Sequence, residues 1–387
     1  SVPCRMTARQ AQAPHAPHDE LVRPLFDAAA AALPAGTTWF DAHTHIGHND
    51  PDGFEAEPDE ILAGLDRAGQ QRAMLFPMHE PGGYRAANDW VIGTCQNSGG
   101  RLTALARVAP SHEDAVAEAR RALDAGAAGI KLHPRSDDFT LPHHAVEEVV
   151  ALIGERGGPV LFHAGRGIPN LGEAVIDMCR RHPGAKIILA HAGISELGWI
   201  APAARELPNL FFDTAWWQVA DLLALYATIP PGQILYASDL PYGSGLFHGF
   251  AFLRCAAAVG LRGEALTAIA GASMERLLAG EEPFDLGPPP GTRGLGARDL
   301  GFERAVTYLG IACQMGWRNL DPTEPLSLAR LALQRTDDHP VAAAADALVA
   351  ADLERLIHHA AEEAGHIMLY GALCGQILCG TPGVHVP

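Results

Sequence analysis

Short apolar runs rich in β-formers recur at regular intervals along the first two thirds of the chain. Each begins 24 to 35 residues after the one before it, and helical-looking segments such as 113–126 and 171–184 fill the intervals. Strand–helix–strand units of this length are typical of parallel strands joined by right-handed crossovers. The eight runs are TTWFDA (37–42), RAMLFP (72–77), LTALAR (102–107), GIKLH (129–133), PVLFH (159–163), KIILA (186–190), LFFDT (210–214) and ILYASD (234–239). They predict a (β/α)8 TIM barrel rather than an open doubly wound sheet, since no Gly-x-Gly-x-x-Gly turn follows the first run.

Outside these runs the pattern changes. A helical stretch at 261–280 would close the last unit, and a Pro- and Gly-rich stretch after it reads as a linker. Helical apolar spacing then returns at 302–316 and at 341–365, just after Pro340. We therefore predict a partly disordered leader with a short helix, a (β/α)8 barrel, a linker and a C-terminal helical appendage, which span 1–36, 37–283, 284–299 and 300–387.

Composition narrows the class of protein. The chain has 387 residues, with 28 Lys plus Arg against 45 Asp plus Glu, and a formal charge of −17. This balance argues against nucleic-acid binding, which depends on phosphate neutralisation. There is no apolar run long enough to span a membrane, the N-terminus lacks a signal-peptide core, and the seven cysteines are scattered. We expect a cytoplasmic protein with reduced thiols that acts on a small molecule and forms a homo-oligomer, with 300–387 as a candidate interface.

Titratable residues gather at the ends of the predicted strands. In FDAHTHIG, Asp41, His43 and His45 alternate, so they share one face of the strand. Further strands end in, or are followed by, Lys131 with His133, His163, His191 and Asp239. Functional residues of (β/α)8 barrels lie at these carboxyl ends, where neutral imidazoles and a carboxylate from different strands can surround a divalent ion.

The segments DAHTHIG, GIKLHP, VLFHAG, LAHAG and ASDLPYG, in this order, resemble the amidohydrolase superfamily, and GASMERLL is similar to its closing segment. The resemblance covers about 37–280 and is greatest to the branch that includes aminocarboxymuconate-semialdehyde decarboxylases. It implies a metal-dependent (β/α)8 barrel. Histidine and aspartate donors suit one divalent metal, for which we expect zinc ahead of Mn, Fe or Co, and we expect no nucleotide cofactor. The resemblance also implies the metal ligands and the catalytic pair, which are His43, His45, His163 and Asp239 for the metal, with Asp239 and His191 as catalytic residues.

The resemblance leaves open whether the site holds a second metal ion. Some members use a carboxylated strand-four lysine as a bridge, so Lys131 and His191 are candidates for a second ion. The setting Lys-Leu-His-Pro is, however, associated with single-metal members.

Other residues near the strand ends are candidates for substrate contacts. Arg166 follows the strand-five histidine and could hold a carboxylate, while Trp216 and Tyr242 could form an aromatic wall. Adjacent residues on a strand face opposite ways, so only one of Trp216 and Trp217 is expected to line the pocket. Asp41 and His133 are expected to support the ligands. Weaker candidates for the pocket are His79, Glu80, Arg107 and His248, and the pair His358 and His359 is interpreted as a solvated helix face or an interface.

Three functions are compatible with these features. The first is a metal-dependent hydrolase, in which a metal-activated water attacks a C–N or C–O bond of a small carbonyl substrate. The alternative is a non-oxidative metal-dependent decarboxylase of a carboxylated ring or enal. The third is a barrel scaffold whose C-terminal helices serve in assembly, which the retained histidine and aspartate set argues against.

Overall fold

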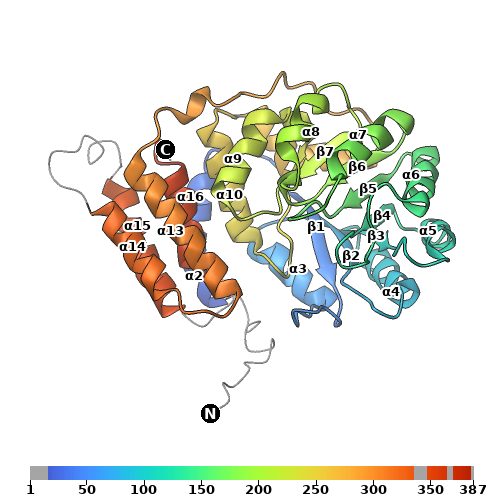
Figure 1. Cartoon of the computed structure of the whole chain (residues 1–387), viewed down its shortest axis with the longest axis horizontal. Helices are drawn as coiled ribbons and strands as arrows, with labels where there is room; N and C mark the ends of the chain where they lie inside the picture. Colours follow the sequence, from blue (N-terminus) through green and yellow to red (C-terminus); the bar gives the residue numbers. More distant parts are fainter. Residues whose placement is uncertain (1–15, 335–346, 364–368, 385–387) are drawn as a thin grey trace, which may run out of the picture.

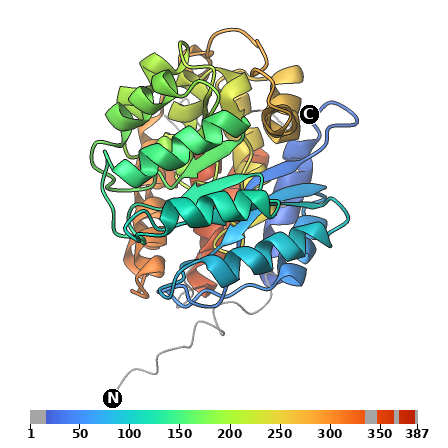
Figure 2. The ribbon, with the colours of Figure 1, turned by 90° about the vertical axis from the view of Figure 1, so that its right-hand side faces the viewer.

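A computed structural model describes residues 16–334, 347–363 and 369–384 of the chain. Eight parallel strands pair in chain order and form one sheet (Figures 1 and 2). They are β1 (Phe40–Ile46), β2 (Arg72–Pro77), β3 (Leu102–Arg107), β4 (Gly129–Leu132), β5 (Pro159–Phe162), β6 (Lys186–Leu189), β7 (Leu210–Asp213) and β8 (Ile234–Leu235). The backbone N–H of Ala42 donates to Tyr236 O (2.8 Å) and that of His45 to Leu240 O (2.7 Å), so β1 meets the chain after β8. The sheet is a nearly closed barrel, and the predicted (β/α)8 fold is confirmed.

Every predicted strand after the first begins at the expected residue, and β4 to β7 each end one residue before the predicted end. The first and last strands differ more. β1 begins at Phe40 instead of 37 and continues to Ile46, so His43 and His45 lie inside it. β8 is only two residues long, and Asp239 lies in the loop beyond it. His163 directly follows β5, and His191 comes two residues after the end of β6. Both therefore lie at the same end of the barrel.

One helix after each strand lies on the outside of the barrel. These helices are α3 (Pro58–Arg67), α4 (Arg85–Gln96), α5 (Ala115–Asp124), α6 (His144–Arg156), α7 (Leu171–Arg181), α8 (Leu197–Ala204), α9 (Val219–Thr228) and α10 (Gly245–Ala258). The closing segment predicted as one helix consists of α11 (Glu264–Thr267), a π-helical turn (Ala268–Ala272) and α12 (Ser273–Leu278). This turn lies against the start of β1, because a Cβ on Gly271 would be 2.6 Å from Thr38 O. Ile269 O in the same turn accepts a hydrogen bond from Tyr236 N (2.9 Å).

The strands are apolar on both faces, as expected for a parallel sheet covered by helices. Side chains that point inward form a packed barrel interior, which includes Phe40, Met74, Phe76, Leu161 and Phe211. Their neighbours along the strands point outward and pack against the helices. The interior is therefore filled with apolar side chains.

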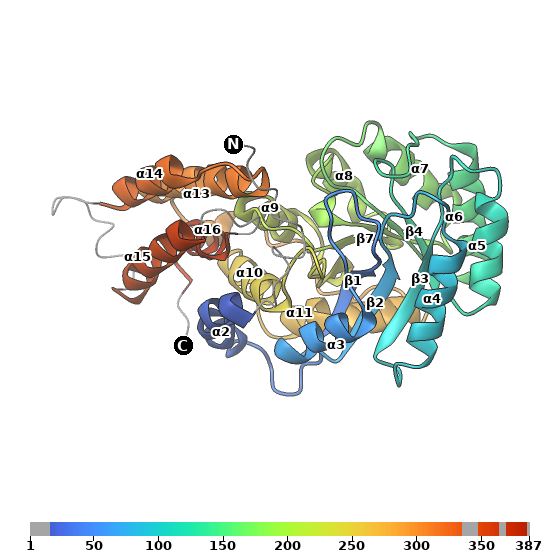
Figure 3. The same ribbon diagram turned by 90° about the horizontal axis from the view of Figure 1, so that it is seen from below.

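The C-terminal helices pack on one side of the barrel. They are α13 (Leu300–Trp317), α14 (Thr323–Leu333), α15 (Ala347–Glu362) and α16 (Tyr370–Gly380), and α2 (Ala16–Ala30) lies beside them (Figures 1 and 3). α16 and α2 both contact α10 of the barrel. Arg254 in α10 donates from Nη2 to Thr381 O (2.8 Å) and from Nε to Thr381 Oγ1 (3.2 Å), which fixes the end of α16.

Parts of the terminal predictions fall outside the described residues. These parts are 1–15 of the leader, and 341–346 together with 364–365 of the predicted helix at 341–365. Within the described ranges, none of the helices combines the length and the apolar character that crossing a membrane requires.

Candidate metal centre and substrate cavity

Three side chains converge at the carboxyl-terminal mouth of the barrel. Nε2 of His43 and Nε2 of His45 lie 3.1 Å apart, and Oδ1 of Asp239 is 3.3 and 3.2 Å from them. Donors about 2.0–2.2 Å from a tetrahedral zinc ion are roughly 3.3–3.5 Å from one another. The three donor atoms therefore already have about the mutual spacing that one divalent ion requires, and the residues fit such an ion.

Asp213 determines which nitrogen of His43 faces this group. Its Oδ2 lies 2.7 Å from His43 Nδ1, and its Oδ1 accepts the backbone N–H groups of His191 (2.8 Å) and Ala215 (3.0 Å). A carboxylate only accepts, so the imidazole proton is on Nδ1 and the lone pair of Nε2 points into the group. A carboxylate behind a histidine ligand is a usual way to orient the ring and raise its basicity.

Sequence reasoning missed Asp213. It is the last residue of β7, within LFFDT. A carboxylate that ends a barrel strand was the available signal, since such residues point toward the mouth.

Burial controls the charge of the group. It lowers the pKa of His43 and of His45 well below the usual range, and it raises the pKa of Asp239 well above its ordinary value. The imidazoles are therefore neutral, which is the form that binds metals. A divalent ion at this position would offset the cost of burying these polar groups.

A second hydrogen-bonded chain lies next to this group. Nδ1–H of His191 donates to Ala215 O (2.7 Å), so Nε2 of His191 accepts from Nδ1–H of His163 (3.0 Å). The lone pair of His163 Nε2 is buried and has no hydrogen-bond partner among the described residues. Burial lowers the pKa of His191 to about 4, so this imidazole is also neutral at neutral pH.

The structure thus brings three of the four predicted metal ligands into one group, and His163 lies beside that group rather than in it. His163 also stacks on His133, with ring centroids 3.8 Å apart and planes at 11°. An unpartnered, buried imidazole lone pair is suited to a metal. Its role as a fourth ligand stays a prediction.

The backbone is strained at two of these positions. His191 has φ 56° and Asp239 has φ 60°, in the left-handed region that residues other than glycine seldom occupy. Asp41 supports the neighbouring backbone, because its Oδ1 accepts the N–H groups of His43 (3.0 Å) and Ser238 (3.0 Å). Strain of this kind is typical of sites where side-chain direction matters more than local stability.

Lys131 is fully buried in the mouth of the barrel. Its Nζ is 4.9 Å from the centroid of the Phe76 ring and makes no hydrogen bond within the described part of the chain. Burial lowers the pKa of Lys131 to about 7, so a large fraction of the amine is neutral near neutral pH. Its place as a bridging ligand of a second ion, with His191, stays a prediction.

A cavity of about 560 Å³ opens over the side chains of His43, His45 and Asp239. Arg166, Trp216 and Tyr242 line it at the positions expected from the sequence. Trp217 lines it too, so the expectation that only one indole would do so was wrong. Both tryptophans follow the end of β7 and are not bound by strand alternation.

Arg166 lies over this indole wall. Its guanidinium carbon is 5.3 Å from the ring of Trp216 and 5.7 Å from that of Trp217, and its Nη1 donates to Gln314 Oε1 (3.2 Å). The indole N–H of Trp216 is fixed by Asp221 Oδ2 (2.7 Å). The wall therefore consists of two indoles tilted by 38° to each other, with the Arg166 guanidinium over both rings.

The C-terminal helices complete the cavity. Cys313, Gln314 and Trp317 from α13 line it, as do Leu369 and Leu373 from the start of α16. The ring of Trp317 stacks on Phe54, with centroids 5.9 Å apart and planes at 18°. No feature of residues 300–387 in the sequence predicts this contribution to the cavity.

Three of the four weaker candidates for the pocket line the cavity. His79, Arg107 and His248 line the cavity, whereas Glu80 is not among its lining residues and accepts from Asn49 Nδ2 (2.8 Å). Arg107 is committed to a buried bidentate pair with Asp137, with Nε and Nη2 each 3.0 Å from the carboxylate. Arg107 is thus a structural cation rather than a free anion receptor.

An eight-stranded barrel with imidazoles and a carboxylate at the carboxyl ends of its strands is the architecture of a large class of barrel enzymes. The family model described as Amidohydrolase matches residues 40–260. The chain belongs to this amidohydrolase family, and it is an enzyme-family barrel rather than a bare scaffold.

The chain is similar to several solved structures. An uncharacterised TIM-barrel protein from Bordetella bronchiseptica is 16% identical, with a TM-score of 0.52 over 63% of this chain and 99% of that one. An amidohydrolase II is 22% identical, with a TM-score of 0.49 over 62% of this chain and 100% of that one. A 5-carboxyvanillate decarboxylase from Sphingomonas paucimobilis is 17% identical, with a TM-score of 0.49 over 63% and 99%. No curated protein matches the chain.

Proposed function

We propose that this protein is a metal-dependent enzyme that removes the carboxylate of a flat, carboxylated substrate without oxidation. The observation that carries the proposal is the cavity itself. Arg166 lies over the indoles of Trp216 and Trp217, in the same cavity that His43, His45 and Asp239 line. Its volume of about 560 Å³ suits a substrate with one ring.

His43, His45 and Asp239 are the residues that would hold the ion, and His163 is the candidate for a fourth ligand. When bound, a divalent ion supplies positive charge and Lewis acidity at the mouth of the barrel. Asp213 keeps the Nε2 lone pair of His43 directed at that position, because its Oδ2 lies 2.7 Å from His43 Nδ1.

Asp239 is the proposed proton donor. One carboxylate oxygen of Asp239 would hold the ion, and the other would carry the proton to the substrate. Delivery of that proton to the ring carbon forms a C–H bond. The C–C bond to the carboxylate then breaks, its electron pair returns to the ring, and carbon dioxide leaves. Water restores the proton to Asp239.

The cavity wall supports carbon–carbon cleavage over hydrolysis. Its indoles, together with Leu369 and Leu373, present apolar surface to the substrate. Loss of neutral carbon dioxide is favoured where a carboxylate is shielded from water. Hydrolysis requires that a water molecule enter and attack.

Hydrolysis of a carboxylated substrate is the second candidate. The observation in its favour is the position of Asp239 Oδ1, 3.2 Å from His45 Nε2, where a carboxylate could accept the proton of an attacking water. Zinc, manganese, iron and cobalt all accept a donor set of imidazoles and a carboxylate.

The test is a panel of carboxylated aromatic compounds and enals offered to metal-loaded protein. Decarboxylation predicts release of labelled carbon dioxide from the carboxyl group and no oxygen-18 from labelled water in the remaining product. Incorporation of oxygen-18 without carbon dioxide release would instead establish hydrolysis. Arg166→Met should raise KM for the carboxylated substrate, whereas Arg180→Met, an exposed arginine of α7, should leave KM unchanged.

A further inference from the structure

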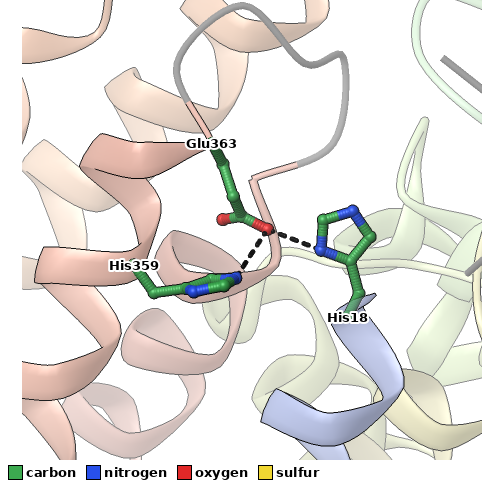
Figure 4. A group of neighbouring side chains, drawn as sticks. All are labelled: His18, His359 and Glu363. Atoms are coloured by element: carbon green, nitrogen blue, oxygen red, sulfur yellow. Dashed lines mark ion pairs between the residues drawn. The ribbon is translucent and has the colours of Figure 1, made fainter. Parts of the chain in front are cut away.

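A second group of metal-type side chains lies outside the barrel, among the terminal helices. It consists of His18 on α2, His359 on α15 and Glu363, the residue directly after α15 ends (Figure 4). Nδ1 of His18 is 2.9 Å from Glu363 Oε1, and Nε2 of His359 is 3.6 Å from the same oxygen. Figure 4 shows both imidazoles directed at that oxygen from different helices.

Glu363 is held in place by the backbone. Its Oε1 accepts the N–H of Tyr370 (3.1 Å) and its Oε2 accepts the N–H of Gly371 (2.9 Å), the first residues of α16. The side chain is only 3% exposed. Both carboxylate oxygens are therefore oriented before any ion binds. Hydrogen bonds of this kind commonly orient the carboxylates that bind metals in proteins.

The two imidazoles approach from different directions. His359 lies four residues before Glu363, so the two side chains share one face at the end of α15. The rings of His18 and His359 are nearly perpendicular, at 85°, with centroids 6.3 Å apart. The ring of Tyr370 packs against His18 with centroids 4.9 Å apart.

The donor set identifies the class of ion. Two imidazole nitrogens and one carboxylate oxygen, all within 4.8 Å of one another, suit zinc and similar transition metals better than magnesium or calcium, which prefer oxygen ligands. The side chains of His18 and His359 are 21% and 28% exposed, so an ion can enter and a water molecule can take the fourth position.

We propose that His18, His359 and Glu363 form a second, structural site for a zinc-like divalent ion, which ties α2 to the junction of α15 and α16. The interpretation of His358 and His359 as one solvated face holds for His358, which is 71% exposed, but His359 turns inward. The junction also bears on the cavity, because Leu369 directly precedes α16 and lines the cavity. The proposal does not depend on the reaction that the barrel catalyses.

The test compares zinc binding in His359→Ala with zinc binding in His358→Ala, its exposed neighbour. Both changes are made in the full chain that also carries His43→Ala and His45→Ala, which removes the barrel group. After stripping with a chelator, the His358→Ala protein should bind one zinc ion per chain, and its Tm should rise by a few degrees with zinc. The His359→Ala protein should bind none and show no zinc-dependent rise.

Equal zinc content and equal zinc-dependent Tm in the two proteins would overturn the proposal, and would leave the group as a hydrogen-bonded ion pair. The same pair of variants in the otherwise unchanged chain covers the case in which the barrel changes prevent folding. There, His359→Ala should lower the zinc content by one ion per chain relative to His358→Ala. A fall from two zinc ions per chain to one means that both sites bind zinc. A fall from one to zero means that the barrel group, and with it the proposed function, fails while the terminal site stands.

Discussion

The contact between Asp213 and His43 offers a sharp test of how the barrel group is built. The Asp213 carboxylate accepts three hydrogens, from His43 Nδ1 at 2.7 Å and from the backbone of His191 and Ala215 at 2.8 and 3.0 Å. In Asp213→Asn only one oxygen remains to accept. If it keeps the two backbone N–H groups, the amide NH2 faces His43 Nδ1. The imidazole proton must then move to Nε2, where it points at the ion position.

This change should weaken metal binding markedly. Loss of a carboxylate partner behind a histidine ligand typically costs about 10–100-fold in affinity, which corresponds to roughly 1.4–2.8 kcal/mol. Zinc affinity measured by competition with a chromophoric chelator should therefore fall by that factor in Asp213→Asn. Asp137→Asn is the matched control, because that buried carboxylate binds Arg107 and no histidine of the group.

An Asp213→Asn protein with native circular dichroism and a zinc affinity within about twofold of wild type would contradict this expectation. It would mean that the tautomer of His43 is not set by Asp213. A loss of affinity equal to that in Asp137→Asn would likewise assign the effect to general destabilisation.

Other residues give further expectations. Asp239→Asn should lower kcat for carbon dioxide release by about 10²–10⁴-fold, as expected for the loss of a general acid, and unchanged turnover would remove Asp239 from the chemistry. Trp317→Ala should raise KM several-fold with little change in Tm, because its ring stacks on Phe54 at the cavity wall; Trp199→Ala, an exposed indole of α8 that does not line the cavity, should leave KM unchanged. Arg107→Met should lower the free energy of unfolding by about 3–5 kcal/mol in urea, because it leaves Asp137 buried without its cation. A loss below about 1 kcal/mol would show that Tyr84, 2.5 Å from Asp137, satisfies the carboxylate alone.

The barrel could be predicted because its information is local. Each strand is a short apolar run, each helix has its own periodicity, and the spacing of the runs determines the topology. The positions of His43, His45, His163, His191 and Asp239 follow from that topology, since the carboxyl ends of all strands meet at one mouth.

The rest depends on contacts between distant parts of the chain. Asp213 is an ordinary strand-end carboxylate in the sequence, and only the position of His43 opposite it gives it a role. Gln314 and Trp317 reach the cavity because the end of α13 lies at the barrel mouth, where Trp317 stacks on Phe54, and no periodicity in 302–316 indicates this. His18 and His359 come together from opposite ends of the chain for the same reason. Self-association through 300–387 stays a prediction.

The most direct test of the central claim is a crystal structure of the zinc-loaded full chain, with anomalous data collected at the zinc edge. We expect an ion at the barrel mouth, about 2.0–2.2 Å from His43 Nε2, His45 Nε2 and Asp239 Oδ1. Absence of anomalous density among these three residues in crystals of protein that carries zinc elsewhere would contradict it.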